Sequence, residues 1–144
     1  MQRKTKILFI EDNEQYGNLI VQYLREKKEY HVDWIKTFVE IDFFVKDALD
    51  YDLIITDIQL PGITGDVITM ILNDTNSLQD IPVLISSGLY DESYLEDKNI
   101  MKALDKALYV DFCEKGKTKW LMFKIDQLLK IRKIAVSNLT IDKK

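Results

Sequence analysis

The chain has 144 residues, of which 47% are hydrophobic and 31% charged, and its formal net charge is −4. This length suits one domain with a substantial core and is too short for two ordinary domains. No apolar run approaches the roughly 20 residues that a membrane-spanning helix needs, and because a basic start is followed by a strand-length apolar block, we expect no secretory signal. We therefore expect a cytoplasmic protein of one domain.

The charge is unevenly distributed along the chain. Residues 1–114 hold 11 basic and 22 acidic side chains, whereas residues 115–144 hold nine basic and two acidic ones. An acidic body argues against binding to nucleic acid, because contacts with phosphates need lysine and arginine. The lysine-rich end is typical of a solvated helix face, and docking of an acidic partner is the alternative.

The first third of the chain predicts two strands, each followed by a helix. An apolar strand at 7–10 runs into Glu11 and Asp12, and Asn13 is a suitable N-cap for a helix. A second strand at 31–36 precedes a helix that Thr37 and Glu40 open as a capping box. The apolar positions expected to be buried in these helices are Tyr16, Leu19, Ile20, Tyr23 and Leu24 in the first, and Ile41, Phe44, Val45, Ala48 and Leu49 in the second.

The rest of the chain repeats this alternation. The β-branched block at 53–56 predicts a strand covered on both faces, and it ends in Asp57 before the turn residues Pro61, Gly62 and Gly65. Two more strands are expected at 81–85 and 108–113. Helices are expected beyond Gly65, after Asp91 and from Thr118, the last with Leu121, Met122, Ile125, Leu128 and Leu129 buried.

Five strands that alternate with five helices predict an α/β fold with a doubly wound, five-stranded parallel sheet sandwiched between the helices. We assign residues 4–132 to this domain. Residues 133–144 show no clear pattern, and we interpret them as a C-terminal tail or the start of a linker.

Three carboxylates lie at the ends of two predicted strands. Glu11 and Asp12 follow the first strand and Asp57 follows the third, at the sheet edge where ligands bind in folds of this class. If those ends are neighbours, each pair of charges repels by about 4 kcal/mol at 4 Å in a medium of effective dielectric near 20. A divalent cation would offset this repulsion, and oxygen ligands favour a hard ion such as Mg²⁺.

Taken in order, the strand ends resemble the receiver domain of two-component response regulators, over residues 4–132. The matching segments are the acidic pair after the first strand, DIQLPGITG after the third, IPVLISSG for the fourth and DFCEK for the fifth. The resemblance implies a flavodoxin-like receiver fold. It also implies a signalling switch, which is an enzyme only in catalysing its own phosphorylation and dephosphorylation.

The resemblance assigns a role to each matched residue. Asp57 would be phosphorylated, and Glu11, Asp12 and Asp57 with the backbone carbonyl of Gln59 would hold Mg²⁺, or Mn²⁺ in its place. Lys115 would pair with one phosphoryl oxygen and Ser87 would donate its hydroxyl to another, so that both join Asp57 as catalytic residues.

Further roles concern switching. Phe112 would turn inward when Ser87 moves, and Gln59 and Leu89 would tune the lifetime of the phosphoryl group. The implied partners are a sensor histidine kinase or phosphotransfer protein, and a downstream protein or fused output domain. Homodimer formation on phosphorylation is also expected, but neither nucleic acid nor a membrane is expected as a partner.

The chain departs from the family pattern at three places. Gly116 follows Lys115 where the family usually has a proline, often with a cis bond; without proline a cis bond costs about 2.5–4 kcal/mol, so a trans bond and a different placement of Lys115 are expected. The segment between Ser87 and Lys115 is longer than usual by several residues. Ser86 offers a second hydroxyl beside Ser87, which we prefer because it directly precedes Gly88.

Two alternative functions remain open from the sequence. One is a receiver-like interaction module that is never phosphorylated. The other is a haloacid-dehalogenase-type phosphatase, which also forms an aspartyl phosphate with Mg²⁺ but needs a second acid two residues after the nucleophile. Gln59 occupies that position and cannot serve as a general acid.

Overall fold

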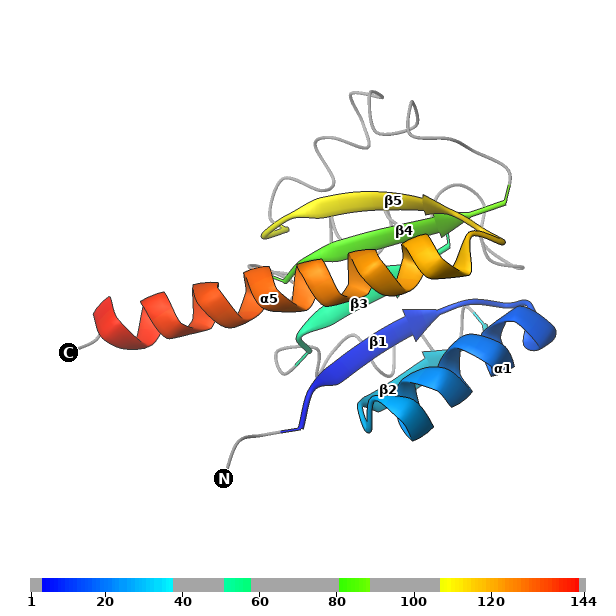
Figure 1. Ribbon diagram of the computed structural model, residues 1–144, viewed down its shortest axis with the longest axis horizontal. Coiled ribbons are helices and arrows are strands. Elements are labelled where there is room, and N and C mark those ends of the chain that lie inside the picture. Colours follow the sequence, from blue (N-terminus) through cyan, green and yellow to red (C-terminus); the bar gives the residue numbers. More distant parts are fainter. Residues whose placement is uncertain (1–3, 38–50, 58–80, 89–106, 143–144) are drawn as a thin grey trace.

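The computed structural model describes residues 4–37, 51–57, 81–88 and 107–142, and they contain one five-stranded sheet (Figure 1). All neighbouring strands are parallel, in the order β2-β1-β3-β4-β5. The strands are β1 (Lys6–Ile10), β2 (His31–Ile35), β3 (Leu53–Thr56), β4 (Val83–Ser87) and β5 (Val110–Glu114). The predicted doubly wound parallel sheet is confirmed, with strand ends displaced by one or two residues.

The burial of each strand follows its apolar sequence. All residues of β3 and β4 are buried, as are four of the five residues in β1. Strands buried on both faces have continuous apolar runs, and the central positions of a parallel sheet require such runs. The edge strands β2 and β5 mix buried with partly exposed residues. Hydrophobic burial therefore accounts for which strands lie in the middle.

Two helices cover one face of the sheet (Figure 1). α1 (Glu14–Gln22) continues as one π-helical segment, η1 (Tyr23–Lys27), and α5 (Thr118–Asp142) crosses in contact with β3, β4 and β5. The core between these helices and the sheet contains Ile7, Phe9, Ile20, Val21, Leu24, Val32, Leu53, Ile55, Leu84, Cys113, Leu121, Ile125 and Leu128. The remaining three predicted helices, at 38–50, beyond Gly65 and after Asp91, lie outside the described residues.

The buried face of α1 differs from the predicted one. Leu19 was expected to be buried, but 70% of it is exposed, whereas Gly17 and Val21 face the core. The reason is a close contact with β2: the Trp34 ring packs against Gly17, and this contact rotates the helix relative to the stripe of large apolar residues. The prediction for Leu19 was therefore wrong, because glycine carries no hydrophobic signal in the sequence.

The last helix is longer than the sequence suggested. It begins at Thr118 as predicted, and Leu121, Ile125 and Leu128 are buried, with Met122 and Leu129 partly buried against the same core. It then continues past residue 132 to Asp142, where no regular element was predicted. Residues 133–142 are thus helical, whereas their interpretation as a tail or the start of a linker, and the domain limit at 132, stay predictions. No helix in the described part of the chain has the length and apolarity that crossing a bilayer requires.

The contact between Gly17 and Trp34 gives a stability prediction. A Cβ atom at position 17 would lie 2.1 Å from Cζ2 of Trp34, so Gly17→Ala forces the helix or the indole to move. We expect the free energy of unfolding to fall by about 1–3 kcal/mol, although alanine favours the helix by about 1 kcal/mol. Urea denaturation measures the change.

Asn18→Ala is the matched control, because Asn18 is the next residue of the same helix and is exposed. Its effect should stay within about 0.5 kcal/mol. A Gly17→Ala protein as stable as the wild type would show that the indole does not restrict this position.

Candidate functional site

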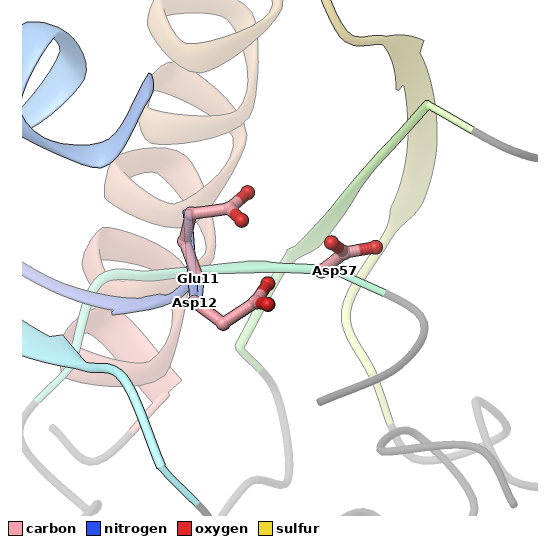
Figure 2. A group of neighbouring side chains, drawn as sticks. All are labelled: Glu11, Asp12 and Asp57. Atoms are coloured by element: carbon pink, nitrogen blue, oxygen red, sulfur yellow. The ribbon is translucent and has the colours of Figure 1, made fainter. Parts of the chain in front are cut away.

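The predicted acidic residues meet at the carboxyl edge of the sheet (Figure 2). β1 and β3 are neighbours in register, with Ile10 opposite Thr56, so the residues that follow them emerge side by side. The Asp57 amide donates to the Ile10 carbonyl at 3.0 Å. Carboxylate oxygens of Glu11, Asp12 and Asp57 all lie within 4.8 Å of one another. The structure thus brings together the three side chains for which the sequence predicted a metal site.

Glu11 is held through both its backbone and its carboxylate. Its side chain is buried, and Oε2 accepts a hydrogen bond from the Asn13 amide at 3.0 Å. Its own amide donates to the Ile35 carbonyl at 2.9 Å, and its carbonyl accepts a hydrogen bond from Nε1 of Trp34 at 2.9 Å. β2 therefore fixes the Glu11 backbone, and the start of α1 fixes the carboxylate.

Asn13 joins the site to the helix. Its Oδ1 accepts a hydrogen bond from the Tyr16 amide at 2.8 Å, which makes it the N-cap of α1 as predicted. A capped first turn orients the residues that follow β1. The N-cap thus both begins the helix and, through its own amide, orients Glu11.

Lys115 bridges the acids of the two strands. Its Nζ lies 2.9 Å from Oε2 and 2.7 Å from Oε1 of Glu11, and 2.7 Å from Oδ2 of Asp57. The Lys115 side chain is 21% exposed and that of Glu11 is 1% exposed. The ammonium therefore neutralises part of the negative charge where β1, β3 and β5 end.

Burial and charge act in opposite directions on this pair. Burial raises the pKa of the Glu11 carboxyl, and the hydrogen bonds from Lys115 and the Asn13 amide offset this effect only in part. Burial also works to lower the pKa of Lys115, but its bonds to Asp57 and Glu11 outweigh burial and leave that pKa raised. Lys115 thus stays a cation in the site.

The glycine after Lys115 does not remove the lysine from the site. The Lys115–Gly116 bond is trans, and Gly116 has a φ of +93°, a conformation that glycine adopts without strain. The Lys115 amide donates to the Ser87 carbonyl at 2.9 Å and so continues the pairing of β5 with β4. The expected trans bond is confirmed, and the turn at Gly116 still directs Lys115 to Asp57.

The two adjacent serines lie on opposite faces of the sheet, because side chains alternate along a strand. Ser86 pairs with Cys113 on the face that α1 and α5 cover, and its Oγ lies 3.1 Å from the hydroxyl of Tyr16. Ser87 pairs with Glu114, on the same face as Phe112. Both serines and Phe112 are buried. Ser87 thus shares a face with Phe112, as the predicted switch needs.

Sequence reasoning missed two residues that touch the site. Tyr16 was assigned to the core of α1, but Lys115 Nζ also lies 5.3 Å from its ring centroid. Trp34 was predicted only as part of a strand, but its indole Nε1 donates a hydrogen bond to the Glu11 carbonyl. Their aromatic character signalled only burial, so the sequence contained no sign of these contacts. Two predicted residues, Gln59 and Leu89, lie outside the described residues.

The donor set fits a hard divalent cation. The ligands that the described residues offer are carboxylate oxygens, one of which, the buried Oε1 of Glu11, lies 2.7 Å from the Lys115 ammonium. Asp12 is exposed, so the cluster opens to solvent. With three carboxylates and one ammonium, the group keeps an excess of negative charge, which Mg²⁺ would neutralise.

A separate cavity of about 520 Å³ lies near Thr5, Asp52 and α5, and none of the residues of the acidic cluster lines it.

Comparison with protein families agrees with this geometry. The family model described as the response regulator receiver domain matches residues 7–115, which include the three acids and Lys115. The chain belongs to the response regulator receiver domain family. Receiver domains are signalling switches of two-component systems, and they bind Mg²⁺ at an acidic site. No curated protein matches the chain significantly.

Solved structures of receiver domains share the fold. One is the signal receiver domain of a protein named as a Luxo repressor from Vibrio parahaemolyticus, at 22% identity and a TM-score of 0.72, covering 92% of this chain and 95% of that one. Another is the receiver domain of the sensor histidine kinase PA1611 from Pseudomonas aeruginosa, whose active site cleft holds a magnesium ion; identity is 20%, the TM-score 0.66, and coverage 89% and 99%. At these identities the likeness shows the receiver fold.

The bridge made by Lys115 gives a second stability prediction. Lys115→Met keeps the length of the side chain but leaves the buried Glu11 carboxylate facing Asp57 without a cation. Removing one partner of a fully buried ion pair costs about 3–5 kcal/mol; since Lys115 is partly exposed, we expect a loss of about 2 kcal/mol. Urea denaturation without divalent ions measures it.

Lys119→Met is the control, because Lys119 is an exposed lysine of α5. It should leave the free energy of unfolding within about 0.5 kcal/mol of the wild type. Equal stability of the Lys115→Met and Lys119→Met proteins would show that repulsion in the cluster is too weak to matter.

Proposed function

We propose that this chain is a phosphorylation-controlled switch in which Asp57 accepts a phosphoryl group from a phosphohistidine of a sensor histidine kinase or phosphotransfer protein. The observation that carries the proposal is the position of Lys115 Nζ, 2.7 Å from the Asp57 carboxylate inside a cluster of two further acids. An aspartate of this kind can act as a nucleophile, because one of its oxygens is held while the cluster opens to solvent.

The transfer itself conserves atoms and charge. An Asp57 carboxylate oxygen forms a bond to phosphorus as the phosphorus–nitrogen bond of the donor breaks, and the histidine leaves with that electron pair. Lys115 keeps an ammonium beside the acceptor, where negative charge increases as the phosphoryl group arrives. Bound Mg²⁺ would supply further neutralisation of the phosphoryl oxygens. Glu11, Asp12 and Asp57 would hold it, with the predicted contribution of the Gln59 carbonyl.

Switching would then follow from the new charge. A phosphoryl group adds up to about two negative charges and several acceptor oxygens, and these bind Lys115 and the hydroxyl of Ser87. Movement of Ser87 would alter the packing of Phe112, which lies on the same face of the sheet. Moving a population from about 1:99 to 99:1 needs about 5.5 kcal/mol, which a few charge-assisted hydrogen bonds can supply.

Partners and location remain part of the proposal. The switch would act on a downstream protein or a fused output domain, through docking or through a homodimer formed on phosphorylation. The donor is a protein of two-component signalling, so we also propose the cytoplasmic location expected from the sequence. We assign no nucleic-acid contact to the domain itself.

Phosphorylation is tested with a small donor. Incubation with Mg²⁺ and acetyl phosphate should add one phosphoryl group to the wild-type protein, detected by intact-mass spectrometry, and Asp57→Asn should abolish it. Asp33→Asn is the matched control, because Asp33 lies in β2 away from the cluster. An unmodified wild type would favour the receiver-like module that is never phosphorylated, and a phosphoryl group on Asp57→Asn would place the acceptor elsewhere.

Metal binding has a built-in optical probe. The Trp34 indole donates to the carbonyl of Glu11, so neutralisation of the Glu11 carboxylate changes the electric field at the indole. In a Trp120→Phe protein, which leaves Trp34 as the sole tryptophan, we expect a saturable change in fluorescence on adding Mg²⁺. Asp12→Asn should weaken the apparent affinity by about tenfold or more.

A Mg²⁺-free titration at matched ionic strength controls for salt effects, and a Trp34→Phe protein controls for signals from Trp120. A titration without saturation, or an Asp12→Asn protein with unchanged affinity, would mean that these acids do not form the metal site.

A further inference from the structure

Tyr16 makes two contacts that packing of the core does not require. Its hydroxyl lies 3.1 Å from Oγ of Ser86 at the end of β4, and its ring centroid lies 5.3 Å from Nζ of Lys115. The rest of the side chain packs against the core between α1 and the sheet. Tyr16 thus extends from α1 to the end of β4, where it lies close to Lys115.

The backbone of Tyr16 is connected to Glu11 through the start of the helix. The Tyr16 amide donates to Oδ1 of Asn13, and the Asn13 amide donates to the Glu11 carboxylate. Lys115 in turn contacts that carboxylate. The contacts therefore run in a closed circuit through Glu11, Asn13, Tyr16 and Lys115.

The Tyr16 ring offers the Lys115 ammonium an uncharged aromatic face, in addition to the two carboxylates that it contacts. An ammonium within about 6 Å of an aromatic centroid is attracted to the face of the ring, and a lysine side chain is flexible along its four-carbon stem. Glu11 and Asp57 attract Nζ through their charges, whereas the ring contacts it without adding a charge. Burial raises the pKa of Tyr16, so the phenol stays neutral and able to share a proton with Ser86.

We propose that Tyr16 is a positioning residue for Lys115, with its ring orienting the ammonium beside Asp57 and with Ser86 fixing the ring. The inference rests on the proposed function for its effect on phosphoryl transfer. The proposal also separates the roles of the two serines. Ser86 forms a hydrogen bond with the Tyr16 hydroxyl on the helix-covered face, and Ser87 is the serine that would bind the phosphoryl group.

The first test compares rates of phosphorylation by acetyl phosphate at saturating Mg²⁺. Tyr16→Leu removes the ring, and we expect the rate at saturating donor to fall about fivefold, the size of a moderate cation–π contact. Tyr16→Phe and Ser86→Ala each remove the same hydrogen bond, so each should slow the reaction about twofold. The double variant should be no slower than either, because both changes act through one bond.

Tyr23→Leu is the matched control, since Tyr23 lies two turns further along and packs partly buried against the same core. It should leave the rate unchanged. The donor concentration for half-maximal rate should also stay the same in every variant, because Tyr16 acts on the lysine and not on donor binding. Urea denaturation confirms that each variant is folded under the assay conditions.

A second measurement does not depend on phosphorylation. The methylene protons of Lys115 next to Nζ should show an upfield NMR shift from the Tyr16 ring in the wild type and in Tyr16→Phe, and the shift should disappear in Tyr16→Leu. If the wild type takes up no phosphoryl group, the proposed function fails and this spectrum alone decides the inference. A folded Tyr16→Leu protein with the wild-type rate, or with unmoved Lys115 signals, overturns it.

Discussion

The contact on which the site depends is the ammonium of Lys115 between the carboxylates of Glu11 and Asp57. Two acids held this close, with Asp12 beside them, repel one another, and Glu11 has little solvent to screen its charge. One cation shared by both reduces that repulsion in the described structure. If Asp57 is phosphorylated as we propose, Lys115 would turn from a cation shared by two carboxylates into a partner of the phosphoryl oxygens.

The sheet makes this contact geometrically possible. In a parallel sheet all carboxyl ends lie at one edge, so residues that follow β1, β3 and β5 meet although they are far apart in the sequence. The strand order places β1 next to β3, and Lys115 reaches them from β5, which pairs with β4. The position of the lysine depends on the turn at Gly116 and on the amide bond to Ser87. A trans bond followed by a glycine with positive φ therefore places Lys115 beside Asp57, at a position where the family usually has a proline after the lysine.

Two aromatic side chains on the helix-covered face of the sheet, Trp34 and Tyr16, contact residues of the acidic site. Trp34 holds the Glu11 carbonyl and restricts position 17 to glycine, which sets the rotation of α1. That rotation exposes Leu19 and orients Tyr16 toward Lys115 and Ser86. The packing of β2 against α1 thus determines that Leu19 is exposed to solvent and that Tyr16 reaches the site.

The amino-acid sequence alone determined the parallel α/β sheet, the N-cap at Asn13, the start of α5 and the three acids, because apolar runs, cap residues and strand ends are local properties. It identified Lys115 only through a family resemblance, since a lysine after a strand has no local sign of its partner. Tertiary structure decided the rotation of α1, the continuation of α5 to Asp142 and the contacts of Tyr16, Trp34 and Ser86. These depend on which surfaces meet when the strands assemble, and a glycine or an aromatic residue in the sequence does not state what will lie against it.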